Sequence, residues 1–358
     1  MRPAAGGIRR HVSDLLEHLD RRQFSPVLFA PTDFVPDCPE ANIVRHSVEI
    51  GATTRPLRDA GTAFYLARLL RRNADIVHAH GLIGAVVGGF AARLAGLPYL
   101  FTVHNLLPEM NPIQSTLFRE LARTASRIIA VSEAVAQTVE RAGVSAGQIA
   151  VVSNGVDLSK FDRPSDVEKV RRELGIATGE RMLLGVGRLA PEKGFDLLIE
   201  AFTILQARPS DIRLVIVGEG EEMLRLKAQA ASLGERVLFP GHRSETAALF
   251  AAADLVVAPS RQEGQGIVPL EAMAAGRAVI AARVGGLVET IVDGVTGLLV
   301  PTEDPHALAN ALETLLNDPK RRSAMGEAGR RRVRQEYALP TQIQKIEALY
   351  RDVFRRTA

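Results

Sequence analysis

Short apolar runs alternate with segments of helical periodicity along almost the whole chain, and this alternation constrains the fold more than any other feature. Strands that alternate with helices favour a parallel sheet with helices on both faces. The apolar runs form two series, one in each half of the sequence. The first comprises residues 25–30, 42–47, 75–79, 98–103, 127–132 and 149–152, and the second comprises 181–186, 212–217, 236–239, 254–258, 278–281 and 297–300.

Two separate cores are expected, because a chain of 358 residues exceeds the length at which a single hydrophobic core usually stops growing. Residues 154–169, NGVDLSKFDRPSDVEK, contain turn formers and a proline without sustained periodicity, which is typical of a linker. We therefore predict two Rossmann-like α/β domains, at residues 1–157 and 158–336. Ligands of such sheets bind beyond the carboxyl ends of the strands, so the residues that follow each strand are candidates for a site.

The C-terminal part of the chain is predicted to be helical. Residues 305–358 contain helix-like segments without a strand between them, and the last segment, 337–358, has an apolar face that must pack on another element. That face comprises Ile343, Ile346, Leu349, Tyr350 and Val353.

The N-terminal helix is predicted without the strand that should precede it. Ile8, Val12 and Leu15 fall on one helical face, yet only MRPAAGG stands before them, where a βαβ unit requires an apolar strand. We therefore expect the chain as written to be truncated at its N-terminus, so that the first strand of the first domain is missing.

Composition argues against several classes of function. The single cysteine, Cys38, rules out an internal disulfide framework and a cysteine-rich metal site. A net charge of +3 does not call for a nucleic-acid partner. We expect a cytoplasmic protein, because no apolar run is long enough to span a bilayer and the start lacks the apolar core of a signal peptide. Arginine pairs such as Arg71–Arg72 would allow peripheral contact with an anionic membrane, although solvated helix ends are the favoured explanation for them.

The stretch GVGRLAPEKGFDLLIEA, residues 185–201, is the first candidate site. Gly187 lets a ligand approach the backbone, while Arg188 and Lys193 can neutralise phosphate oxygens, a combination that suits a diphosphate. The letters GVGRLA also match the dinucleotide fingerprint, but Pro191 and the late start of the helix argue against that interpretation. A glycine turn with solvated charges remains the structural alternative.

The stretch RQEGQGIVPLEAMAAG, residues 261–276, is the second candidate site. Glu263 falls in a glycine-rich loop just after the predicted strand 254–258, and Glu271 falls in the first turns of the following helix. Two carboxylates at one strand end can accept hydrogen bonds from different parts of a polyhydroxylated ligand. Glycoside hydrolases also use two carboxylates, but these flank the scissile bond rather than sharing one loop and helix.

The two stretches resemble those of the retaining glycosyltransferases of family 4, which have the GT-B fold. Further matches run through nearly the whole chain in the family's order. They are GG at 6–7, HAHG at 78–81, TVHN at 102–105, NGVD at 154–157, VGEG at 217–220, FPGH at 239–242 and DGVTGLLV at 293–300. The resemblance implies two Rossmann-like domains facing each other across a central cleft, with the last helix crossing back to the N-terminal domain.

The resemblance also implies roles for individual residues. Arg188 and Lys193 would hold the donor diphosphate, Glu263 would contact the hydroxyls of the donor sugar, and Glu271 would hold the ribose of the nucleotide. The remaining positions that the resemblance places around the donor are Gly6, Gly7, Gly187, Gly218, Gly241, His242, Gly264, Gly266, Ile267 and Val268.

Two histidines follow predicted strands of the first domain. The resemblance places His104 near the reacting carbon, hydrogen-bonded to the donor sugar, so we group it with Arg188, Lys193 and Glu263 as catalytic. His80 would help the acceptor. A histidine at a strand end is more often a local hydrogen-bonding residue, which is the structural alternative for both.

The resemblance implies an enzyme that moves a sugar from a nucleotide diphosphate, UDP rather than GDP, to an acceptor hydroxyl with retained anomeric configuration. The acceptor would be a glycan or a lipid-linked molecule in envelope glycan, polysaccharide or glycolipid synthesis. In the family the departing phosphate oxygen takes the acceptor proton, so no protein base, metal ion or cofactor besides the donor is expected. The sequence leaves the oligomeric state open.

Two other functions remain open at this point. The same fold hosts nucleotide-sugar 2-epimerases, although the pairing of Arg188 with Lys193 and of Glu263 with Glu271 favours a transferase. A non-catalytic protein that binds a nucleotide sugar is the alternative from another class, and the short N-terminus would suit it.

Overall fold

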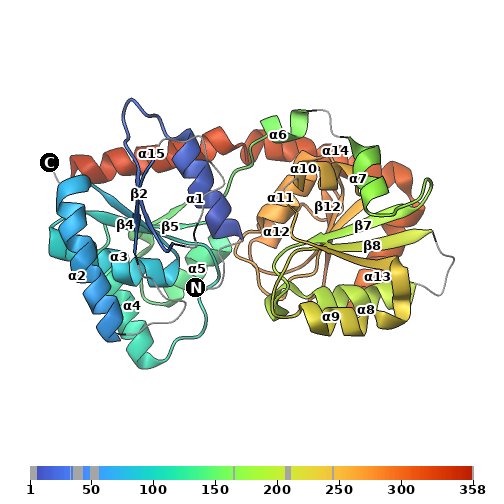
Figure 1. Cartoon of the computed structure of the whole chain (residues 1–358), viewed down its shortest axis with the longest axis horizontal. Helices are drawn as coiled ribbons and strands as arrows, with labels where there is room; N and C mark the ends of the chain where they lie inside the picture. The colour runs from blue at the N-terminus through green and yellow to red at the C-terminus, as the bar shows by residue number, and fades with distance from the viewer. Residues whose placement is uncertain are drawn as a thin grey trace. The chain divides into compact units, whose positions relative to one another are not determined.

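The computed structural model describes residues 6–32, 34, 43–48, 56–163, 166–205, 211–243 and 246–356. The chain divides into two compact units, the first formed by Met1–Asn154 with Leu339–Ala358 and the second by Gly155–Ala338. In Figure 1 each unit contains strands covered by helices. Each of the strands predicted from the sequence overlaps one strand of the structure, β1 to β12.

The first unit contains two parallel sheets. One has the strand order β3 (Val77–His80), β4 (Tyr99–Val103), β5 (Arg127–Ala130) and β6 (Ile149–Val151). The other pairs β1 (Val27–Ala30) with β2 (Val44–Ser47). The helices of this unit are α1 (Gly7–His18), α2 (Pro56–Asn73), α3 (Gly81–Ala95), α4 (Pro112–Thr124), α5 (Glu133–Arg141), the 3₁₀ turn η1 (Ala146–Gln148) and α15 (Leu339–Arg355). Residues 1–5, where a preceding strand would join, lie outside the described residues, so the missing first strand stays a prediction.

The larger sheet of the first unit is buried on both faces. Successive side chains of a strand point in opposite directions, so neighbouring residues of β4 enter different apolar clusters. On β4, Phe101 packs into a cluster that includes Phe118 of α4, whereas Leu100 packs with residues of α1 and α15. Both side chains are fully buried. A continuous apolar strand such as YLFTV is typical of a parallel sheet covered by helices on both sides.

Helix α15 belongs to the first unit although it ends the chain. Ile343, Ile346 and Val353 lie in one buried cluster with Leu15 and Leu19 from the N-terminal part of the chain. Figure 1 shows α15, in red, running beside α1. The apolar face of the last helix is therefore covered within this unit.

The second unit has a six-stranded parallel sheet with the order β12-β11-β10-β7-β8-β9. These strands are β7 (Arg181–Val186), β8 (Ile212–Val217), β9 (Val237–Gly241), β10 (Leu255–Ala258), β11 (Val279–Ala282) and β12 (Gly297–Val300). The helical segments are α6 (Ser159–Asp162), α7 (Val167–Glu173), η2 (Pro191–Lys193), α8 (Phe195–Leu205), α9 (Met223–Gln229), η3 (Ala231–Arg236), α10 (Thr246–Ala252), α11 (Ile267–Ala274), α12 (Leu287–Thr290), α13 (Pro305–Asn317) and α14 (Pro319–Glu336).

Two apolar cores cover the two faces of this sheet. Met182 and Leu184 of β7 lie in a cluster with residues of α7, α10, α11 and α14, whereas Leu183 lies in a cluster with residues of α8, α9 and α13. The period of two along β7 thus sends alternate side chains to opposite cores. Burial on both faces fixes the strand register and with it the positions of the loops at the carboxyl ends.

The division between the two units falls between Asn154 and Gly155, inside the segment 154–169 that the sequence predicts as the linker, and from Gly155 onward this segment belongs to the second unit. The segment contains α6, whose Phe161 packs on the apolar core, and the N–H of Val156 donates to the carbonyl oxygen of Tyr337 at 2.8 Å. The described part of this segment is therefore held by both packing and hydrogen bonding. A sequence pattern cannot show this, because the packing partners lie far away along the chain.

Among the described residues, none of the helices combines the length and the apolar character that a membrane span requires.

Candidate functional site

The strand order of the second unit creates a topological switch point beside β7. From β7 the chain moves to β8 and β9 on one side, and it later returns to β10 and β11 on the other side. The loops after β7 and β10 therefore leave neighbouring strands in opposite directions. Ligands of open α/β sheets bind in the crevice that this arrangement opens at the carboxyl ends.

The two loops at the switch point touch through their backbones. Gly194, which ends η2, has φ +65°, and a Cβ atom built there would lie 2.2 Å from the carbonyl oxygen of Pro259. Only glycine meets both requirements without strain. This contact brings the cations that follow β7 next to the carboxylate that follows β10.

Lys193 and Glu263 form an ion pair across the switch point. Lys193 Nζ lies 2.6 Å from Glu263 Oε2, which also accepts a hydrogen bond from Ser260 Oγ at 3.2 Å. The lysine side chain is 26% exposed and the carboxylate 14% exposed, so the pair is partly withdrawn from water but open on one side. A diphosphate could therefore bind the lysine, and a sugar hydroxyl could donate a hydrogen bond to the carboxylate.

Arg188 lies in the same loop and is paired with Glu192. About a third of each of these side chains is exposed, so the contact is worth little to stability. Both predicted cations of the loop therefore have glutamate partners, and each partner can be replaced by a more highly charged ligand.

Arg261 is a residue of this region whose role sequence reasoning missed. Its guanidinium donates to both carboxylate oxygens of Asp196, at 2.7 and 3.0 Å, and to the carbonyl oxygen of Pro191 at 2.9 Å. The Asp196 carboxylate raises the pKa of Arg261 above its usual range. Arg261 thus ties the loop after β10 to the loop after β7 and holds Glu263 near Lys193.

Helix α11 begins directly after the loop that carries Glu263. Gly266, with φ +86°, precedes its first residue Ile267 and provides no capping side chain. The first N–H groups of a helix have no partner within the helix, so this end suits an anion. Glu271 lies in the same helix and is only 9% exposed.

The predicted glycine after β8 approaches the loop after β7 and is hydrogen-bonded to the predicted glycine that ends β9. A Cβ atom on Gly218 would lie 1.8 Å from the carbonyl oxygen of Gly187, and the N–H of Gly218 donates to the carbonyl oxygen of Gly241 at 2.9 Å. His242, one residue further, is exposed. Gly218 thus links Gly187 to Gly241, the last residue of the edge strand β9, and His242 follows directly after that strand.

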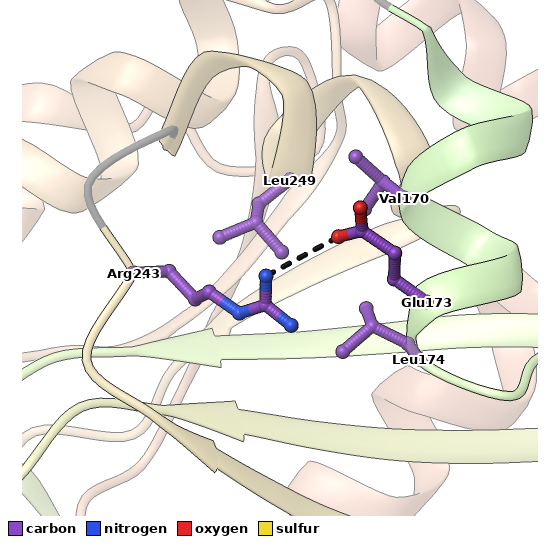
Figure 2. A pocket seen from close by; sticks show the side chains of 5 residues that line it. All are labelled: Val170, Glu173, Leu174, Arg243 and Leu249. Atoms are coloured by element: carbon purple, nitrogen blue, oxygen red, sulfur yellow. Dashed lines mark hydrogen bonds and ion pairs between the residues drawn. The ribbon is translucent and has the colours of Figure 1, made fainter.

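A pocket near α7 does not qualify as the site. Figure 2 shows Arg243 and Glu173 as an ion pair of 3.3 Å, beside Val170, Leu174 and Leu249. Its cavity volume of about 10 Å³ leaves room for about one water molecule. The Arg243–Glu173 pair is therefore a useful control for the pair at the switch point.

The other predicted residues lie in the first unit. Gly6 caps the N-terminal end of α1 and Gly7 is its first residue. His80 ends β3 and His104 follows β4, with His80 Nδ1 3.3 Å from His104 Nε2. His11 of α1 lies against both rings, at centroid distances of 5.3 Å from His80 and 4.8 Å from His104. The sequence singled out His80 and His104 but not His11.

Burial keeps these imidazoles neutral. It lowers the pKa of His11 to about 4, with a smaller opposing effect from the hydrogen bond to Asn154. Burial also holds the pKa values of His78, His80 and His104 well below the usual range, and the neighbouring histidines add to this effect. Each ring is thus an acceptor as well as a donor at neutral pH.

We expect the free energy of unfolding to fall between pH 7 and pH 5. Unfolded histidines titrate near 6.5 and folded His11 near 4, so the unfolded state binds more protons in this window and stability decreases as the pH falls. His11 alone contributes about 2 kcal/mol of this loss. Urea unfolding at the two pH values measures the change. Equal stability at pH 7 and pH 5 would contradict the predicted burial of neutral rings.

Comparisons with known proteins identify the family of the chain. Residues 166–332 match the family Glycosyl transferases group 1, and residues 5–160 match Glycosyltransferase Family 4. The chain is 33% identical to D-inositol 3-phosphate glycosyltransferase of Nocardia farcinica over 90% of its own length and 79% of that protein. The chain belongs to glycosyltransferase family 4.

This family 4 glycosyltransferase is also similar to a second curated relative and to a solved structure. It is 35% identical to D-inositol 3-phosphate glycosyltransferase of Corynebacterium glutamicum over 277 residues, which are 71% of this chain and 66% of that protein. Its fold matches the crystal structure of Anabaena HepE in complex with UDP and glucose, with a TM-score of 0.85, 26% identity and 98% of each chain covered.

The predicted GT-B fold is confirmed, since this family 4 glycosyltransferase shares its parallel α/β architecture with HepE and with a sucrose-phosphate synthase from Thermosynechococcus elongatus, at TM-scores of 0.85 and 0.84. The prediction that it is a glycosyltransferase is confirmed by the family and by the relatives. The roles assigned to individual residues stay predictions.

Proposed function

We propose that the protein transfers a sugar from a UDP-sugar to an acceptor hydroxyl and retains the anomeric configuration. The Lys193–Glu263 ion pair carries this proposal, because it sets a cation for a diphosphate beside a carboxylate for sugar hydroxyls at the switch point. UDP is supported by HepE, which was crystallised with UDP and with UDP-glucose.

Donor binding would exchange the partners of the charged side chains. The diphosphate would replace Glu263 on Lys193 and Glu192 on Arg188, and Glu263 would then be free to accept hydrogen bonds from the sugar. Backbone N–H groups at Ile267 and Val268, at the start of α11, would bind phosphate oxygens, and Glu271 would accept hydrogen bonds from the ribose.

The cations would then act on the transition state. As the bond between the anomeric carbon and the phosphate oxygen breaks, negative charge grows on the diphosphate beside Lys193 and Arg188, which are already in place. The departing oxygen takes the acceptor proton while the acceptor oxygen bonds to the same face of the sugar. Since two cationic side chains supply the required charge, we propose neither a metal ion nor a cofactor besides the donor.

For the acceptor we propose a hydroxyl of a glycan or lipid-linked molecule, reached by a cytoplasmic protein with peripheral membrane contact. The relatives named for D-inositol 3-phosphate add a phosphorylated cyclitol as a second acceptor class. We propose that His104 contacts the donor sugar and that His80 faces the acceptor side.

A panel of UDP- and GDP-sugars tests the proposal through release of the nucleotide diphosphate, with and without D-inositol 3-phosphate or lipid-linked glycans. We expect one UDP-sugar to be turned over, slowly to water and faster with an acceptor. Glu263→Ala should lower the rate at least about 100-fold, because the carboxylate acts on the reacting sugar. Arg243→Ala removes a surface ion pair and serves as the matched control.

Each other outcome points to a different function. Release from GDP-sugars alone would overturn the choice of nucleotide, and inversion at the anomeric carbon, read by NMR of the product, would overturn the retaining mechanism. A free 2-epimer would indicate an epimerase. Donor binding without any release would indicate a non-catalytic binding protein.

A further inference from the structure

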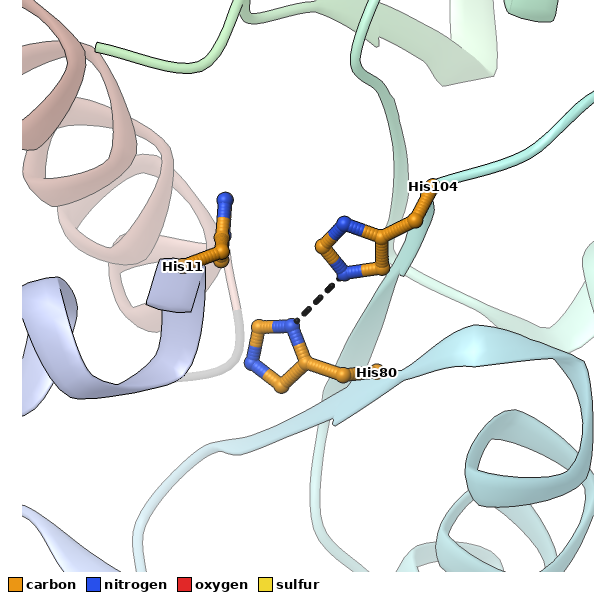
Figure 3. Close-up of side chains that lie close together, drawn as sticks. All are labelled: His11, His80 and His104. Atoms are coloured by element: carbon orange, nitrogen blue, oxygen red, sulfur yellow. Dashed lines mark hydrogen bonds between the residues drawn. The ribbon is translucent and has the colours of Figure 1, made fainter. Parts of the chain in front are cut away.

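Three imidazoles from separate elements converge in the first unit. His11 comes from α1, His80 from the end of β3, and His104 from the residue after β4. Their nearest ring nitrogens all lie within 4.8 Å of one another. Figure 3 shows the three side chains close together, with the His80–His104 contact dashed.

His11 provides an independent sign that this space can hold a ligand. The residue is 2% exposed, and its Nε2 atom is buried without a hydrogen-bond partner. Its Nδ1 atom lies 2.8 Å from Asn154 Oδ1 and 3.0 Å from Gln342 Nε2. When Nδ1–H donates to Asn154, Nε2 keeps a free lone pair. Unpartnered polar atoms in such a place are costly, and a ligand would satisfy this one.

The neighbouring His78 does not join this set. Its Nδ1 atom lies 2.6 Å from the Tyr350 hydroxyl and its Nε2 atom 2.7 Å from Thr102 Oγ1. Both nitrogens are thus engaged by hydroxyl groups. These contacts also position the sheet end from which His80 projects.

We propose that His11, His80 and His104 together bind a divalent transition metal of the zinc class. Imidazole is the preferred ligand of such metals, whereas Mg²⁺ and Ca²⁺ prefer oxygen. In a tetrahedral zinc site with bonds of about 2.1 Å, ligand nitrogens are about 3.4 Å apart. His80 Nδ1 and His104 Nε2 are already 3.3 Å apart, so only His11 has to move closer.

The second layer of the site fits this assignment. Metal-bound histidines usually donate their other ring N–H to a carbonyl or carboxylate oxygen, which fixes the tautomer that leaves the ligating nitrogen free. Asn154 Oδ1 takes this position behind His11. Three protein ligands leave a fourth position for water or an anion.

If the proposed function holds, the metal is an inhibitor rather than a cofactor. A bond to His104 Nε2 would hold the ring that we assign to the donor sugar, so we expect metal and donor to compete. Metal binding itself is measured without turnover, so a failure of the transferase proposal leaves this test intact.

Titration of the full, tag-free chain with Co²⁺ and Zn²⁺ tests the site. We expect one equivalent of Co²⁺ to give the visible absorption of tetrahedral coordination, Zn²⁺ to displace it, and Mg²⁺ to do neither. Zn²⁺ should also raise the melting temperature of the wild type, because it binds only the folded state.

Variants locate the metal. His11→Ala should weaken binding by more than the roughly 10- to 100-fold that loss of a supporting residue such as Asn154 costs. His306→Ala, which removes an exposed histidine of the second unit, should bind as the wild type does. Should His11→Ala unfold, His104→Ala and the wild-type melting shift carry the test. A wild-type titration equal to that of His11→Ala, or a loss in His306→Ala, would overturn the proposal.

Discussion

Replacing Lys193 with alanine is expected to lower kcat for sugar transfer by about 10²- to 10³-fold, the usual cost of removing one group that stabilises developing charge. The change removes a cation and leaves the 14%-exposed Glu263 carboxylate at the switch point with Ser260 as a partner. A diphosphate would then meet a negative charge where it now meets a neutral pair. Both the rate and the affinity for the donor should therefore fall.

Two further variants separate this explanation from a loss of structure. Arg243→Ala breaks another ion pair of the same unit and should change kcat by less than about twofold. The double variant Lys193→Ala with Glu263→Ala should lose less than the sum of the two single effects, because both residues act on one bound donor. Steady-state kinetics with a UDP-sugar gives kcat for the wild type, the two single variants, the double variant and Arg243→Ala. An alanine at 193 that retains wild-type kcat would mean that this lysine does not bind the diphosphate.

The strands of both units were predictable because their sequences are short, apolar and bounded by turn residues. Local periodicity was sufficient to predict β7 and β10. It therefore also located the loops after these strands, which carry Arg188 and Glu263. The same local signal located the segment 154–169, in which the division between the two units falls. Its turn formers were recognised, but the hydrogen bond from Val156 to Tyr337 joins residues that are far apart in the sequence.

Long-range partners also explain which site residues were missed. Arg261 stands two residues before Glu263, but its function depends on Asp196, which lies in the first turn of α8. His11 gave a local signal, since it falls on the apolar face of α1 between Ile8 and Leu15. A polar residue at such a position is a candidate for a buried contact. Its neighbours His80 and His104 come from β3 and β4, which only the folded sheet brings to α1.

The glycines at the carboxyl ends link the fold to the proposed chemistry. They let the backbones of the loops after β7, β8 and β10 touch. These contacts hold Arg188, Lys193 and Glu263 at the end of the sheet where the carboxyl ends of the strands lie. The charged residues can act on one ligand only because these backbones approach closely. Replacing one of these glycines should therefore lower both the stability and the activity of the protein.

Gly218→Ala is expected to destabilise the protein by about 3 to 4 kcal/mol, combining backbone strain with overpacking. The added Cβ would lie 1.8 Å from the carbonyl oxygen of Gly187, at a backbone φ of +143°. The loop that carries Arg188 must move away to relieve this clash. Activity should hence be lost even at temperatures at which the variant remains folded.

Gly241→Ala separates the clash from the backbone effect. Gly241 accepts the hydrogen bond from Gly218 and has φ +77°, but its Cβ would meet nothing closer than 3.9 Å. Its replacement should cost about 1 to 2 kcal/mol, the price of a left-handed conformation alone. Urea unfolding of both variants beside the wild type, with donor turnover at low temperature, measures the two effects. Equal stabilities of the two variants would show that the loop after β7 yields to the added methyl group, and that close backbone contact does not hold Arg188 in place.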